Sequence, residues 1–147
     1  MKYFDETYPK PPSPCNCMNI RRASRAVTQF YDEVLKPSGL TIVQMGLLRY
    51  IELFEPVTIS ELAKKMRIDR TTLNRNMKPL SDADLITVNP GKDSRTRQIR
   101  LTEKGKAAVA QAGELWGKAQ ELLQKYLGDE ELIRFIQIMS KLEALVP

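Results

Sequence analysis

The stretch TISELAKKMRIDRTTLNRNMKPL, residues 58–80, decides which fold is predicted for this chain. Thr58 and Glu61 have the spacing of a capping box, so a short helix is expected to begin here. Asp69 is a good N-cap for a second helix soon after the first. Two short helices joined by a tight turn form a helix-turn-helix.

The second of these helices is predicted to have two different sides. Leu73, Met77 and Leu80 recur at helical spacing and indicate a buried side. Pro79 stands late in the helix and is expected to kink it or to end its regular hydrogen bonding. The opposite side is polar, basic and rich in hydrogen-bond donors, and its residues are Arg70, Thr71, Thr72, Asn74, Arg75 and Lys78.

Two short strands are predicted after this helix, at residues 85–88 and 98–101, because apolar and polar residues alternate there. The connection between them carries the basic residues Lys92, Arg95 and Arg97, so the expected structure is a β-hairpin with a basic tip. A helix-turn-helix followed by such a hairpin is a winged helix-turn-helix, which is expected over residues 57–101.

These residue types suit duplex DNA, whose major groove, about 12 Å wide, admits one α-helix. Asn74 suits adenine, Arg75 suits guanine or a phosphate, and the two threonines let the backbone approach closely. Arg95 and Arg97 could enter or straddle the minor groove. Each residue alone has a structural alternative, such as a solvated or salt-bridged Arg75, or a pair between Asp93 and Arg95. The ordered combination is what favours DNA.

The excess positive charge lies in the same part of the chain. The chain has 23 Lys and Arg against 18 Asp and Glu, a net charge of +5. Residues 57–104 hold 11 of the basic and 6 of the acidic residues, so they account for the whole excess. A solvated basic face would explain this count, but a phosphate-binding module on a neutral scaffold explains the motifs as well.

Apolar residues at heptad-like spacing flank the winged segment on both sides. Before it, one helix is expected to end near Pro37, and another to run over residues 42–54 from a capping box at Thr41. After it, Thr102 is expected to cap a long helix. Gly128-Asp129 is expected to end that helix and to cap a final one. The apolar faces of these helices could pack together in a bundle within one chain. Because residues 57–101 are too few to cover three such helix faces, a homodimer is the preferred interpretation.

The expected fold is therefore mainly α with a small β-hairpin wing, a winged helix-turn-helix flanked by N- and C-terminal dimerisation helices. Residues 1–14 contain four prolines and are expected to be an extended or disordered arm. Residues 15–147 are expected to form a single domain, in which 15–54 and 102–147 dimerise and support residues 57–101. No apolar run is long enough for a membrane span and no secretory signal pattern is present, so a cytoplasmic location is expected.

The chain has no histidine, the commonest general base and transition-metal ligand, so neither an enzyme nor a metal site nor a cofactor is expected. Cys15 and Cys17 are one residue apart, a poor geometry for a bridge to each other. They stand at the start of the first helix, whose dipole favours thiolate, so they are candidate redox sensors; the alternative is packing near the dimer interface. The candidates for an aromatic ligand pocket, or else for plain core, are Tyr31, Tyr50, Phe54 and Trp116.

From about Cys15 onward the sequence resembles the MarR family of bacterial regulators. The resemblance is carried by GLTIVQMGLL at 39–48, by residues 58–80, by Asp93-Ser-Arg95 and by LTEKG at 101–105. It implies a triangular homodimer with interlocked terminal helices, whose two winged segments bind a pseudo-palindromic operator. It also implies repression that a small, often aromatic, ligand relieves. Asp84 stands where the family usually has glycine, and Asp tolerates the left-handed geometry of that turn better than most residues.

Two other classes of function are alternatives to a DNA-binding regulator. A winged-helix module that binds protein would keep the fold and the dimer, but it would not need excess positive charge on the helix and hairpin. A small enzyme would need a base and a nucleophile, for which the chain offers only its two cysteines and scattered carboxylates. A DNA-binding transcription regulator is therefore the predicted function.

Overall fold

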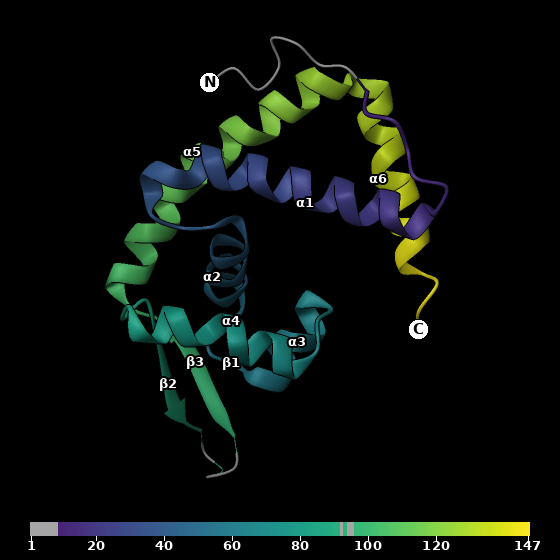
Figure 1. The fold of residues 1–147 in the computed structure, drawn as a ribbon. Coiled ribbons are helices and arrows are strands. Elements are labelled where there is room, and N and C mark those ends of the chain that lie inside the picture. The colour runs from purple at the N-terminus through teal and green to yellow at the C-terminus, as the bar shows by residue number, and fades with distance from the viewer. Residues whose placement is uncertain (1–8, 92, 94–95) are drawn as a thin grey trace.

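The computed structural model describes residues 9–91, 93 and 96–147. The described part is mainly helical and has one small sheet, which confirms the predicted fold class (Figure 1). The elements, in chain order, are α1 (Asn16–Leu35), a short 3-10 helix η1 (Lys36–Ser38), α2 (Ile42–Phe54), β1 (Val57–Thr58), α3 (Ile59–Met66), α4 (Arg70–Asp82), β2 (Ile86–Pro90), β3 (Arg97–Leu101), α5 (Glu103–Leu127) and α6 (Asp129–Glu143). Of the predicted arm, residues 1–8 lie outside the described residues, and residues 9–14 contain no helix or strand.

Four helices begin at the side chains from which they were predicted. Each side chain accepts a hydrogen bond from the backbone N–H three residues later, which satisfies one of the free donors of the first helical turn. In α2 and α3 the third helical residue also accepts a bond from the backbone of the capping residue, so both capping boxes are complete. The four capping residues are Thr41, Thr58, Asp69 and Thr102.

Two local expectations differ from the structure. Of the two alternatives for Pro79, the end of regular hydrogen bonding is wrong: α4 continues to Asp82, and the Pro79 carbonyl still accepts from Ala83 N at 3.0 Å. A kink at Pro79 stays a prediction. Asp129 does not cap α6, which has no side-chain cap. Its carboxylate instead accepts a hydrogen bond from the Gln124 side chain, 2.9 Å away, and Gly128 makes the turn at φ 84°.

The sheet has three antiparallel strands in the order β1-β3-β2. The predicted hairpin is formed by β2 and β3, which extend further toward its tip than the alternation indicated. Ile99 lies between Val57 of β1 and Val88 of β2 in the register and is fully buried. The short strand β1 therefore fixes the base of the wing to the end of α2.

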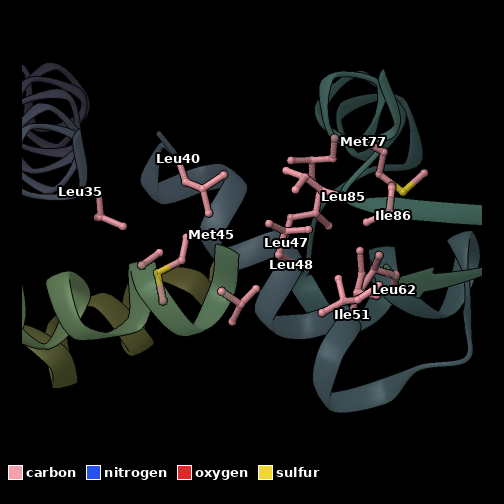
Figure 2. Packing of buried hydrophobic residues seen from close by; sticks show 14 of the residues in the cluster. Leu35, Leu40, Met45, Leu47, Leu48, Ile51, Leu62, Met77, Leu85 and Ile86 are labelled. Carbon is pink, nitrogen blue, oxygen red and sulfur yellow. The ribbon is translucent and has the colours of Figure 1, made fainter. Parts of the chain in front are cut away.

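A continuous hydrophobic core joins α1, α2, α5 and the winged segment, which is the name used below for residues 57–101. Its centre is α2, where Leu47, Leu48 and Ile51 are almost completely buried (Figure 2). α6 contributes no buried residue to this core. Figure 1 shows α1 crossing between α5 and α6, with α2 and the winged segment below it.

A tight joint connects the turn before β2 to the beginning of α5. The Thr102 hydroxyl accepts from Gly105 N at 3.0 Å and donates to the Asp84 carbonyl at 2.6 Å, while Thr102 N donates to the Leu85 carbonyl at 3.1 Å. Asp84 has the left-handed φ of 59° that was expected of it. A Cβ at Gly105 would lie 2.1 Å from the Leu85 carbonyl oxygen, so only glycine fits this close approach.

We expect Gly105→Ala to lower the free energy of unfolding by about 2–3 kcal/mol, because the added methyl group forces the joint apart. Urea or thermal unfolding measures this change. The matched control is Gly46→Ala in α2, where a Cβ meets nothing within 4 Å. That variant should be neutral or more stable by up to about 1 kcal/mol. Equal unfolding free energies for the two variants would contradict the role given to the joint.

Candidate nucleic-acid interface

The two sides of α4 are separated as predicted. Leu73, Met77 and Leu80 are buried in the core, next to α2 and the sheet. The polar residues of the other side are exposed, apart from the half-buried Thr72, and they are Arg70, Thr71, Asn74, Arg75 and Lys78. The helix therefore presents one continuous polar surface to solvent.

Asp69 holds the first turn of this surface in place. Its carboxylate accepts hydrogen bonds from Thr72 N at 2.8 Å and from the Thr72 hydroxyl at 2.7 Å. The bond from the Thr72 backbone, followed by the one from its hydroxyl, holds the pKa of Asp69 below its ordinary value. The Thr72 hydroxyl therefore donates its proton within the protein, and toward a ligand it can act only as an acceptor.

The cations of α4 are largely uncompensated. Among the described residues, Arg70 and Arg75 take part in none of the ion pairs, which disfavours the salt-bridged alternative for Arg75. Lys78 lies 4.0 Å from the Asp82 carboxylate, and both side chains are mostly exposed. An exposed pair at this distance contributes little, so Lys78 stays available to an anionic partner.

One residue of the wing is brought next to α4. Arg97 of β3 lines a groove between α4 and the hairpin, and Asn74 and Lys78 line the same groove. Lys92 and Arg95 lie outside the described residues. The structure therefore places Arg97, alone of the three predicted wing residues, beside the α4 surface.

The groove also contains residues that the sequence analysis did not single out. Asn89 lines it from β2, and its register opposite Gln98 could have been predicted by extending the strand pattern toward the tip. Asp82 and Asp84 line it as well and make part of the groove acidic. No local pattern indicated that these carboxylates face the groove.

The candidate redox residues are accessible. Cys15 and Cys17 are exposed free thiols at the beginning of α1. The backbone N–H of Cys15 donates to the Ser13 hydroxyl at 3.1 Å, and Ser13 in turn exchanges two hydrogen bonds with the Asn19 side chain. The start of α1 is thus held by local hydrogen bonds while both thiols face solvent.

The four candidate aromatic residues do not form one cluster. Tyr31 belongs to the core and donates a hydrogen bond to the Gln120 side chain, and burial raises its pKa. Tyr50 and Phe54 contact each other at the surface with ring centroids 6.2 Å apart. Trp116 is 41% exposed on α5. The core interpretation therefore holds for Tyr31 alone.

A large apolar surface is exposed on the helices outside the winged segment. α6 has no buried residue, and the first half of α1 is exposed as well. The large apolar side chains on this surface are Met18, Ile20, Trp116, Tyr126, Ile133, Phe135, Ile136 and Ile138. So many large apolar side chains exposed on a few helices usually mark an interaction site.

Among residues 9–91, 93 and 96–147, no helix has the length and apolar character needed to cross a membrane. Within the same residues, His, Cys, Asp and Glu side chains form no group of three or more that could hold a metal ion.

Comparison with known proteins identifies the family. A model of the MarR family matches residues 38–96. HTH-type transcriptional regulators of Bacillus cereus and Bacillus thuringiensis are 28% identical over 125 residues, which is 84% of this chain and 84% of each relative.

Solved structures agree with this match. The Staphylococcus aureus MepR–DNA complex shares the fold, with a TM-score of 0.78 at 20% identity over 91% of this chain and all of that one. The Mycobacterium tuberculosis transcriptional regulator MosR, in complex with DNA, is 38% identical and has a TM-score of 0.77 over 89% of this chain and 97% of that one. The chain belongs to the MarR family of winged-helix transcription regulators.

Proposed function

We propose that this protein is a sequence-specific DNA-binding repressor, which binds a pseudo-palindromic operator as a homodimer and releases it in response to a ligand or an oxidant. The observation that carries the proposal is the polar surface of α4, on which Arg70 and Arg75 have no ion-pair partner among the described residues. The similar M. tuberculosis regulator was crystallised with DNA, which supports the same role for this surface.

In the proposed complex, α4 enters the major groove. Asn74 and Arg75 contact base edges, because an amide suits adenine and a guanidinium suits guanine. The remaining polar residues of α4 bind phosphates near the groove walls. Arg97 contacts a phosphate where the hairpin straddles the adjacent minor groove, together with Lys92 and Arg95.

The proposed homodimer is formed by α1, α5 and α6, within the dimerisation and support segments 15–54 and 102–147. The support is the exposed apolar surface of these helices, which a second copy would cover. Two winged segments would then lie about one helical turn of DNA apart, roughly 34 Å, and would match two half-sites related by a twofold axis.

Selection of bound sequences from a random duplex pool tests the function directly. An enriched palindrome would support both the dimer and sequence-specific binding. Binding to random duplex at low salt should weaken steeply as salt rises, because bound phosphates release their counterions. Failure to bind any duplex at low salt would contradict the proposal and favour a module that binds protein.

We expect Arg75→Ala to weaken binding to the selected operator by about 1–3 kcal/mol and to relax the preference at one base pair, as loss of a base contact does. Fluorescence anisotropy with the operator and with single-base variants measures both effects. Arg49→Ala removes the same side chain from the exposed side of α2, where only the exposed pair with Glu52 is lost, and serves as the control. If the two variants bound equally, α4 would not be the helix that reads the bases.

We expect Arg97→Ala to weaken binding about equally for operator and unrelated duplex, because a phosphate contact carries no sequence information. The slope of the logarithm of affinity against that of salt concentration should fall in magnitude by about 1. A salt titration of the parent and the variant measures this slope. Arg49→Ala on α2 is again the control, and its slope should match the parent's. A loss confined to the operator would contradict a phosphate contact.

We expect hydrogen peroxide to lower operator affinity in the parent and not in the double variant Cys15→Ser/Cys17→Ser. Peroxide oxidises an accessible thiolate to sulfenic acid, and both thiols are exposed at the start of a helix that is proposed to dimerise. Anisotropy before and after treatment, with thiols counted by mass spectrometry, measures the effect. Unchanged affinity after full oxidation would leave ligand binding as the proposed signal.

A further inference from the structure

α6 is the helix that the rest of the chain holds least. None of its residues belongs to the hydrophobic core or to the partly buried residues packed against that core. At its beginning it is fixed to α5 by the turn at Gly128 and by the hydrogen bond from Gln124 to Asp129. Little apolar burial determines the direction in which the helix then runs.

The other end of α6 makes one specific contact with the winged segment. Glu143, its last residue, lies with a carboxylate oxygen 2.6 Å from Nη1 of Arg67, in the turn between α3 and α4. Ser140, Ala144 and Val146 line a surface hollow beside this pair. In Figure 1 the C-terminal end of α6 descends toward the winged segment. The pair therefore joins two elements that the core does not join.

Arg67 is an unexpected residue for the backbone position that it occupies. It ends α3 with φ 56° and ψ 44°, the left-handed conformation that glycine and asparagine adopt most readily. Its side chain is 74% exposed, so burial does not explain the presence of a long residue. The ion pair with Glu143 does explain it, because glycine or asparagine could not make this contact.

We propose that Arg67 and Glu143 form a positioning pair that fixes the angle between the winged segment and α6. The proposal rests on the proposed function, in which α6 contacts the second copy through side chains such as Ile133 and Ile136. The angle between α6 and the winged segment then determines the distance between the two winged segments of a dimer. Both residues act through this distance, and Glu143 does so without touching DNA.

The expected effect is modest and specific. An exposed ion pair contributes little, and a dimer contains two copies, so about a two- to tenfold change in affinity is expected. Without the pair, the distance between the two winged segments of a dimer is no longer fixed. Binding to a full palindrome must then fix this distance, and the entropic cost lowers the affinity for the palindrome. Binding to a duplex with a single half-site does not require that ordering. The ratio of palindrome affinity to half-site affinity is therefore the diagnostic quantity.

The experiment measures this ratio by anisotropy at low salt for the parent, Glu143→Gln and Arg67→Gly. Glycine suits the φ of position 67, and glutamine keeps the shape of Glu143, so both variants should fold and remain dimeric, as checked by light scattering. We expect the ratio to fall about two- to tenfold in each. The doubly exchanged variant Arg67→Glu/Glu143→Arg should recover it. Glu131→Gln changes an exposed carboxylate of α6 that forms none of the ion pairs within the described part of the chain, and it should leave the ratio unchanged.

The outcomes separate this inference from the proposed function. If the parent binds the palindrome and the two single variants keep its ratio, the positioning pair is overturned while DNA binding stands. A fall in both single variants that the exchanged variant fails to recover also overturns it, since the side chains then act separately. Absence of any DNA binding by the parent overturns the proposed function and this inference with it.

Discussion

The close approach of Gly105 to the Leu85 carbonyl is the constraint on which the geometry of the winged segment depends. The end of α4, the start of β2 and the start of α5 all meet there, and Thr102 bonds to two of the three. Lys104 adds a hydrogen bond to the Ala83 carbonyl at 3.0 Å. The surface of α4 and the wing are consequently fixed to α5, and they change position together with it.

The continuous core extends this constraint to most of the chain. α2 packs between α1, α5 and the winged segment, so flexing within this unit would open a close-packed interior. A signal that changes DNA binding is therefore expected to act where packing within the chain is poor, on α6 and the first half of α1. Cys15 and Cys17 lie at the start of that region, which makes oxidation there a reasonable means of altering the proposed dimer.

Features set by neighbouring residues were predictable from the sequence. The caps at Thr41, Thr58, Asp69 and Thr102 depend on contacts over three residues, and the two sides of α4 follow from helical periodicity. Features set by distant residues were not predictable. The pairing of β1 with β3, the acidic part of the groove and the contact of Arg67 with Glu143 join segments far apart in the chain. α4 continues past Pro79 because a proline removes only one backbone donor, and the sequence alone did not decide between this and an end of regular hydrogen bonding.

The charge count of the winged segment overstates the charge that faces a ligand. Arg67 is paired with Glu143, and Asp82 and Asp84 line the groove beside α4. The three cations of α4 and the basic residues of the hairpin then make the proposed phosphate contacts of one winged segment, and contacts of this kind weaken steeply as salt rises. Because phosphate contacts dominate affinity, a single segment should bind weakly at physiological salt. Tight binding then requires two segments held at the correct distance, and the helices outside the winged segment determine that distance.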